Sequence, residues 1–163
     1  REYVKKHEAE MPRTSMALVH DTGTGKVIGL GLQGREVLKP VFDGLAESLT
    51  PLGFKEVNLR PLMGTDHQSF ERVGVPGFAC RQDMSEYRFT HHSQSDTLDK
   101  AHEADLVQGA QVMAVLAMRV ANLPELLPRD KPATARDRPG RGKAGEKKDG
   151  EKKATEKKAV EKK

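Results

Sequence analysis

The sequence predicts an α/β fold in which short buried strands alternate with amphipathic helices. Two stretches, residues 35–49 and 103–122, repeat apolar residues every three or four positions, as helices packed on a sheet do. Four short apolar runs bounded by turn residues have the length of buried strands, at residues 15–20, 26–32, 54–59 and 77–80. Chains that alternate these patterns form layered α/β domains.

The first elements place an aspartate at a sheet edge. Residues 2–10 predict the end of a helix with a solvated face, closed by Pro12. The apolar run that follows ends at Asp21-Thr-Gly-Thr-Gly, which predicts that Asp21 stands at the carboxyl end of a strand. In open α/β sheets, ligands are held at this edge.

Prolines and glycines punctuate the predicted helices. Pro40 either kinks the helix over residues 35–49 or lies within its first turn, and Pro51 with Gly53 ends that helix. A short helix is predicted over residues 69–73. The alanines and methionines of residues 103–122 favour a helix packed closely on a sheet over a methionine-lined ligand pocket.

The C-terminal part of the chain has a different composition. Tryptophan is absent from the sequence. Hydrophobic residues make up only 36% of it, because residues 129–163 consist mainly of Lys, Glu, Asp, Gly, Ala and Pro. These residues carry a net charge of +7, which leaves −3 for residues 1–128. We therefore expect a Lys/Glu-rich tail that is disordered or a transient solvated helix, and that solubilises the protein. Electrostatic binding of the tail to anionic surfaces or nucleic acid is the alternative, and we expect no specific nucleic-acid partner for the folded part.

Cysteine content and apolar runs exclude several classes of protein. The single cysteine, Cys80, forms no intramolecular disulfide, offers no zinc-finger spacing and is expected to be a small buried core residue. No apolar run approaches the ~18 residues of a membrane span. No signal peptide is visible, but the chain begins with Arg1 and not with Met, so it is interpreted as an internal fragment or a truncated sequence, upstream of which an export signal could lie.

Residues 64–97 hold most of the side chains that could carry chemistry. Asp66 and His67 lie near the beginning, and His91, His92 and Asp96 lie near the end. Imidazoles and carboxylates bind zinc or transfer protons near neutral pH. The alternative is a surface loop whose polar residues only cap helices and satisfy turns.

Asp21 by itself admits several interpretations. An aspartate before Thr-Gly is a good turn starter. A phosphate-binding P-loop is excluded, because His20 stands where its first glycine belongs and Val27 replaces its Ser/Thr. The Asp-Thr-Gly sequence also occurs in aspartic proteases, but the predicted helices argue against that all-β fold.

The segment GTDHQSFERVGVPGF, then Tyr87, then HHSQSDT resembles the C-terminal part of the two-zinc exopeptidases. That family includes bacterial aminopeptidases, glutamate carboxypeptidases and carboxypeptidase Q, and the doubled histidine is most similar to the carboxypeptidase Q branch. The resemblance covers residues 1–128. It implies a three-layer α/β sandwich with a mixed, mostly parallel sheet that is incomplete at the N-terminus.

The resemblance also implies one metal ligand for each of two zinc ions. Asp21 aligns with a zinc-binding aspartate at a strand end, and His92 aligns with the histidine four residues before the Asp of the Asp-Thr pair. Adjacent side chains of an extended segment point to opposite sides, so His91 is assigned to packing, substrate contact or surface. Asp96 or Thr97 is expected to cap the last helix.

Three further residues match the pocket of the resembled family. Asp66 and His67 are expected to line the substrate pocket or to orient the ligands from behind. Tyr87 matches an active-site tyrosine whose hydroxyl could hydrogen-bond a developing oxyanion. A half-buried aromatic residue with its hydroxyl in water is the equal alternative for Tyr87.

The resemblance implies a zinc-dependent exopeptidase that hydrolyses terminal peptide bonds, with a peptide substrate and a homodimer as one possible assembly. The family's His-x-Asp and Glu-Glu motifs are absent here, so we expect the general-base Glu upstream and no activity from this chain alone. Secretion or a periplasmic location is also implied. The alternative is a non-catalytic relative of the same fold that acts as a binding or scaffold module.

Overall fold

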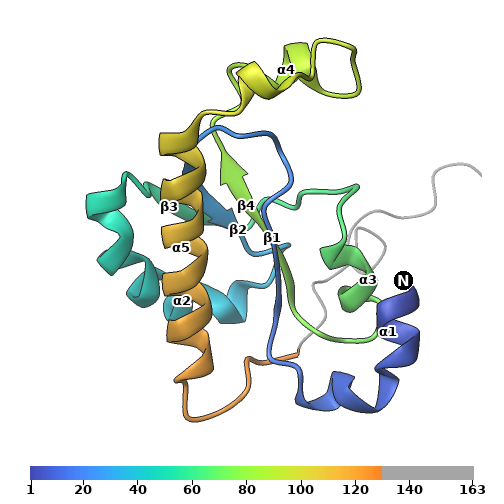
Figure 1. The fold of residues 1–163 in the computed structure, drawn as a ribbon. Coiled ribbons are helices and arrows are strands. Elements are labelled where there is room, and N and C mark those ends of the chain that lie inside the picture. The colour runs from blue at the N-terminus through green and yellow to red at the C-terminus, as the bar shows by residue number, and fades with distance from the viewer. Residues whose placement is uncertain (130–163) are drawn as a thin grey trace, which may run out of the picture. The chain divides into compact units, whose positions relative to one another are not determined.

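The structure, a computed structural model, describes residues 1–129 (Figure 1). The Lys/Glu-rich tail predicted from the sequence lies outside the described residues, except for Arg129. Arg129 belongs to the folded part, because its Nη2 donates hydrogen bonds to the carbonyl oxygens of Met11 (3.0 Å), Pro12 (2.9 Å) and Thr14 (2.6 Å). The domain boundary near residue 128 stays a prediction.

Four strands form one mixed sheet in the order β1-β4-β2-β3. The pairs β1·β4 and β2·β3 are parallel, and β4·β2 is antiparallel. Two of the three pairings are thus parallel, which confirms the predicted mixed, mostly parallel sheet. The strands are β1 (Ala17–Val19), β2 (Val27–Gly31), β3 (Glu56–Asn58) and β4 (Gly77–Gln82).

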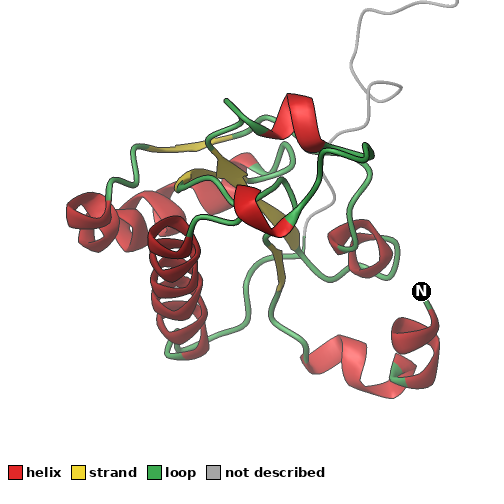
Figure 2. Ribbon diagram, turned by 45° about the horizontal axis from the view of Figure 1, so that its top comes forward, coloured by secondary structure: helices red, strands yellow, loops and turns green. Residues whose placement is uncertain are grey.

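Helices lie on both sides of this sheet, which confirms the three-layer arrangement (Figures 1 and 2). Helices α2 and α5 pack against β2 and β3, whereas α3 packs against β1 and β4. The α-helices are α1 (Glu2–Lys6), α2 (Lys39–Ala46), α3 (His67–Glu71), α4 (Tyr87–Thr90) and α5 (Glu103–Ala121). Short 3₁₀ helices cover Glu8–Arg13, Glu36–Leu38, Glu47–Leu52 and Leu98–Lys100.

The main hydrophobic core lies between the sheet and the helices α2 and α5. Its centre includes Phe42 of α2 and Phe78 of β4, whose rings meet edge to face with centroids 5.0 Å apart. Aromatic pairs prefer this geometry. A smaller cluster of Val4, Met11 and Val75 joins the first helical segments to the turn before β4.

Two glycines explain why the apolar run of residues 26–32 forms a central strand. A Cβ at Gly29 would lie 2.5 Å from the carbonyl oxygen of Glu56, and one at Gly31 would lie 2.6 Å from that of Arg60. Any side chain there would force β3 and its extension away from β2. Glycine is therefore required by the close approach of this backbone.

The helical segments differ from the sequence expectation where proline occurs. Residues 2–10 form α1 and then a 3₁₀ helix that contains Pro12, so Pro12 does not close the segment. Pro40 lies in the first turn of α2, one of the two positions expected for it. Pro51 is inside a 3₁₀ helix that ends only at Gly53, whose φ of 83° is left-handed.

The expectation that Asp96 or Thr97 caps the last helix is wrong. Helix α5 begins at Glu103 with His102 at its N-cap. A separate 3₁₀ turn of residues 98–100 intervenes, and its Lys100 carbonyl accepts a 2.7 Å hydrogen bond from Thr24 Oγ1. This tertiary contact fixes the turn, so the chain enters α5 only after two extended residues.

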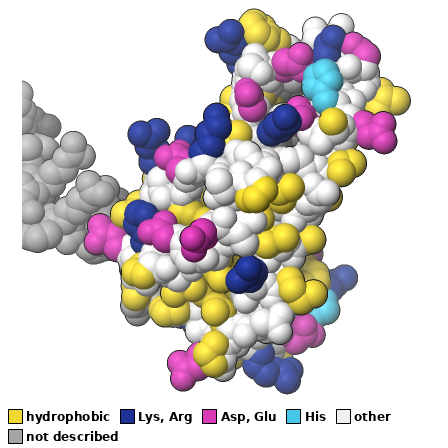
Figure 3. Space-filling view, turned by 90° about the vertical axis from the view of Figure 1, so that its left-hand side faces the viewer, with side chains coloured by type: hydrophobic (Ala, Val, Ile, Leu, Met, Phe, Trp, Pro, Cys, Tyr) yellow, Lys and Arg dark blue, Asp and Glu magenta, His cyan; other side chains and the backbone are white. Residues whose placement is uncertain are grey.

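Helix α5 is a core helix of this domain. By length and composition alone it could cross a membrane. The sequence has no long uninterrupted apolar run there, so the sequence pattern did not indicate this. However, Val112, Leu116 and Val120 are buried in the main core. The face drawn in Figure 3 shows hydrophobic side chains between charged ones. Val107 and Met118 of α5 are among the exposed hydrophobic residues of the described chain.

Cys80 is a buried core residue, as the sequence predicts. It lies on β4 within the main cluster. Burial raises the pKa of its thiol to about 12. The thiol therefore stays protonated near neutral pH and is not a nucleophile.

Candidate metal and substrate site

The candidate site lies where two neighbouring strands end. Asp21 follows β1, and the loop of residues 83–102 follows β4. Because β1 and β4 are parallel, both segments emerge at the same edge of the sheet. They enclose a cavity of about 590 Å³, lined by Asp21, Thr22, Gly23, Leu62, Met63, Gly64, Thr65, Met84, Tyr87, Thr90, His91, His92 and Asp96.

The two predicted metal ligands line this one cavity. Asp21 and His92 are both exposed on its wall. A carboxylate oxygen and an imidazole nitrogen are ordinary zinc ligands, so the donor set fits that metal. Within residues 1–129 no group of three or more His, Cys, Asp or Glu side chains is placed to hold a metal ion. The described residues thus offer part of a coordination set, and each ligand assignment stays a prediction.

The two adjacent histidines do not point to opposite sides. Their rings are stacked, with centroids 3.8 Å apart and planes 23° from parallel. The sequence argument for separating them assumed extended backbone, but His92 has a φ of 53°. This left-handed residue turns the second ring back over the first, so the argument was wrong. His91 lies in turn 4.7 Å from the ring of Tyr87.

Tyr87 begins α4 and is packed against the loop that follows Asp21. Its ring leaves no room for a side chain at Gly23, where a Cβ would lie 3.0 Å from Tyr87 Cδ2. Gly23 also has a left-handed φ of 83°, which glycine adopts most readily. The half-buried ring thus lies between Gly23 and His91, on the wall of the cavity.

His67 and Asp66 occupy different environments. Asp66 is exposed at the N-cap position of α3. His67 is 0% exposed and does not line the cavity. Its Nδ1 is hydrogen-bonded to Oγ1 of Thr65, which does line it. Burial lowers the pKa of His67 against the opposing effects of the Leu62 backbone carbonyl, an acceptor for the ring, and the charge of Asp66, so the ring is neutral near pH 7.

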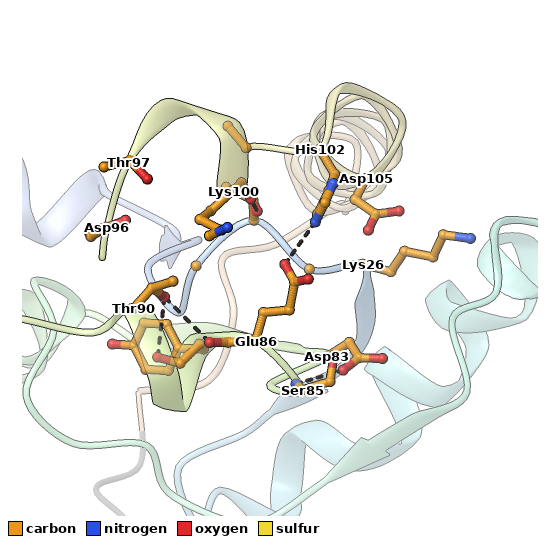
Figure 4. A pocket seen from close by; sticks show the side chains of 15 residues that line it. Lys26, Asp83, Ser85, Glu86, Thr90, Asp96, Thr97, Lys100, His102 and Asp105 are labelled. Carbon is orange, nitrogen blue, oxygen red and sulfur yellow. Dashed lines mark hydrogen bonds and ion pairs between the residues drawn. The ribbon is translucent and has the colours of Figure 1, made fainter. Parts of the chain in front are cut away.

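A second cavity of about 400 Å³ adjoins the first and shares Gly23, Tyr87, Thr90 and Asp96 with it. Figure 4 shows Glu86 reaching across to His102, and the carboxylate lies 2.7 Å from the Nε2 atom of that ring. This contact ties the start of the loop of residues 83–102 to the N-cap of α5. Both partners are about half exposed, so the pair contributes little to stability.

Sequence reasoning missed Thr22 and Gln82. The Gln82 side chain is buried at the end of β4 and hydrogen-bonds to residues 22–25, directly after Asp21. A polar residue that ends an apolar strand was the only local signal. The partner lies sixty residues away in the sequence, so no short motif contains both.

Comparison with known proteins identifies the family. Residues 3–117 match the sequence pattern of peptidase family M28. The chain belongs to this family. Carboxypeptidase Q from Rattus norvegicus is 32% identical over 128 residues, and the proteins of the same name from Pongo abelii and Homo sapiens are 33% and 31% identical over the same length.

The M28 relatives are much longer than the match. Each alignment covers 78% of this chain but 27% of the carboxypeptidase Q sequence. A crystal structure of a peptidase M28 precursor from Shewanella amazonensis SB2B superposes with a TM-score of 0.69 at 32% identity, and covers 80% of this chain and 30% of that one. The chain thus spans under a third of these relatives and has the fold of part of an M28 peptidase.

Proposed function

We propose that the protein containing this chain is a zinc-dependent exopeptidase that hydrolyses terminal peptide bonds. The observation that carries the proposal is the meeting of Asp21 and His92 on one cavity in a member of peptidase family M28. Both residues are the metal ligands that the sequence resemblance implies. The carboxypeptidase Q relatives support the exopeptidase class.

In this proposal Asp21 and His92 each contribute one ligand to a different zinc ion. Zinc, when bound, acts as a Lewis acid that polarises the scissile carbonyl and lowers the pKa of water. Because the match covers 27% of the carboxypeptidase Q sequence, the remaining ligands and the general base would come from residues outside this chain. The chain alone is therefore not expected to hydrolyse peptides.

Tyr87 and His67 have separate proposed roles. The Tyr87 hydroxyl donates a hydrogen bond to the oxyanion that develops on the substrate carbonyl, since the ring lies on the cavity wall beside His91. Neutral His67 holds Thr65 on that wall. Asp66 is exposed near the same turn and is available to contact a bound peptide.

The location of the protein is part of the same proposal. The Shewanella relative is described as a precursor, which supports secretion or a periplasmic location. In either location the exopeptidase would act on peptides outside the cytoplasm.

The test uses the full-length protein with Asp21→Asn and His92→Ala variants. We expect about two zinc ions per wild-type chain by elemental analysis, hydrolysis of dipeptides that a chelator abolishes, and about one ion less in each variant. His7→Ala is the control, because His7 lies after α1 and contacts Glu10 instead of the cavity.

Two results would contradict the proposal in different ways. Full zinc content in both variants would show that neither Asp21 nor His92 is a zinc ligand. A wild-type protein that binds peptides but neither holds zinc nor hydrolyses them would be a binding module on the same fold.

A further inference from the structure

We infer that Gln82 is a positioning residue, which fixes the loop that carries Asp21 and thereby sets the metal affinity of that carboxylate. This inference rests on the proposed function. Gln82 is the last residue of β4 and is 3% exposed. Its Oε1 accepts hydrogen bonds from the backbone N (2.9 Å) and the Oγ1 (2.8 Å) of Thr22. Its Nε2 donates to the carbonyl oxygens of Gly23 (2.6 Å) and Gly25 (3.2 Å).

These contacts determine the orientation of the amide. The Thr22 backbone nitrogen can only donate, and the carbonyls of Gly23 and Gly25 can only accept. The oxygen must therefore face Thr22, and the nitrogen must face the two glycines. All four hydrogen-bonding positions of the amide are used, and every one is directed at the loop of residues 22–25.

The loop has few other attachments. In the part of the chain that the structure describes, residues 21–25 make no backbone-to-backbone hydrogen bond. Thr24 Oγ1 donates to the Lys100 carbonyl, and Tyr87 packs on Gly23. A Cβ at Gly25 would collide with the Asp83 carbonyl oxygen. The loop is thus closely confined, and Gln82 supplies most of its directional contacts.

Asp21 depends on this arrangement through the next residue. Thr22 directly follows Asp21, and both of its donors end on the same Gln82 oxygen. The Asp21 side chain is exposed and no hydrogen bond between residues 1–129 involves its carboxylate. Its place on the cavity wall is set by the backbone that Gln82 holds. Loss of residues that orient metal ligands typically lowers metal affinity by about 10- to 100-fold.

Gln82→Glu in the full-length protein is the first test. The substitution keeps the shape and one acceptor oxygen, but it replaces the donor that faces the carbonyls of Gly23 and Gly25 with a second oxygen. Gln108→Glu is the matched control. Gln108 is 8% exposed on α5, and its amide is likewise bonded to backbone atoms of Val27 and Leu52, away from the cavity.

We expect Gln82→Glu to weaken zinc binding by about 10-fold or more, measured by competition with a chromophoric chelator. Gln108→Glu should lower the melting temperature comparably but leave zinc affinity within about twofold of wild type. Equal zinc affinities in the two variants would overturn the inference while the proposed function stands. A wild-type protein that binds no zinc would overturn both.

A second pair of variants covers the case in which Gln82→Glu does not fold. Thr22→Val removes one of the two donors to Gln82 and keeps the side-chain shape, whereas Thr22→Ser retains the hydroxyl. We expect zinc affinity to fall several-fold in Thr22→Val and to be restored in Thr22→Ser. Equal affinities in both would count against the role of Gln82.

Hydrogen exchange of the metal-free protein gives a readout that is independent of zinc. The Thr22 amide donates to Gln82 Oε1. Gln82→Glu keeps this acceptor but loses the bonds to the Gly23 and Gly25 carbonyls, so the loop should open more often and the Thr22 amide should exchange faster than in wild type or in Gln108→Glu. Unchanged exchange at Thr22 in Gln82→Glu would show that other contacts hold the loop, and the inference would fail.

Discussion

At the residue scale, the stacking of His91 on His92 changes the roles expected of these two adjacent histidines. One imidazole was expected to be a ligand and the other a bystander facing away. Instead, the left-handed backbone at His92 places both rings on the same cavity. His91 lies between Tyr87 and His92, so it can support the ring that is proposed to bind zinc.

This geometry predicts graded effects in the full-length protein. His92→Ala should remove one zinc ion. His91→Ala should weaken that ion's binding by only about two- to tenfold, which is the worth of one aromatic contact. His91→Phe keeps a ring in the stack and should bind zinc as wild type does. Chelator competition measures all three, and equal losses in His91→Ala and His92→Ala would refute this assignment.

His67 predicts how stability depends on pH. Its pKa is lowered in the folded state by burial, whereas the unfolded chain binds a proton at about pH 6.5. Between these two values the unfolded state holds more protons. Stability should therefore fall as the pH drops below about 6.5, until the folded pKa is reached.

The measurement compares melting temperatures from pH 7.5 to 5.5 in the wild type and in His67→Gln. The variant should be less stable at pH 7.5 but should lose less stability on acidification. The comparison is needed because burial raises the pKa of Glu71 in the folded state. Above about pH 4.5 this raised pKa increases stability as the pH falls, which opposes the effect of His67. Parallel curves would rule out His67 as the source.

At the element scale, one side of α5 packs in the core and the other side is exposed to solvent. Leu116 is 1% exposed in the main core, and Met118, two positions on, is 66% exposed. The sequence predicts the helix and its period, and the structure shows which side faces the sheet.

This division predicts different costs for two truncations in α5. Leu116→Ala should lower the free energy of unfolding by about 2–5 kcal/mol, because it leaves a cavity in a packed core. Met118→Ala should change it by less than about 0.5 kcal/mol, as surface substitutions do. Urea unfolding of the full-length protein measures both. A loss at Met118 that matched the loss at Leu116 would mean that this face is covered.

At the scale of the whole described domain, Arg129 joins the end of the fold to its beginning. Its guanidinium bonds to carbonyls of the segment that precedes β1. Contacts between residues so far apart in sequence close the domain. The composition change at Arg129 gave no sign of them.

Arg129 therefore predicts where the chain can be shortened. Deletion of residues 130–163 should leave the melting temperature nearly unchanged, because that segment has almost no apolar side chains to bury. Arg129→Ala should lower stability by about 1.5–3 kcal/mol, the worth of a charged hydrogen-bond donor. Arg119→Ala is the control, because Arg119 is an exposed residue of α5. A drop of several degrees on deletion would show that the segment docks.

The sequence by itself determined the α/β class, the approximate place of each strand and long helix, and the family. These properties are local: hydrophobic periods, turn residues and contiguous motifs such as GTDHQSF and HHSQSDT are written along the chain. Asp21 and His92 could be selected on this basis. So could the burial of Cys80, because it lies inside an apolar run.

Only the tertiary structure decided how these pieces meet. The His91–His92 stack depends on one backbone angle, the late start of α5 depends on a hydrogen bond from Thr24, and the Gln82 contacts join segments sixty residues apart. Each is fixed by packing between distant parts of the chain, where backbone angles and hydrogen-bond partners are chosen by neighbours in space. No local pattern carries that information.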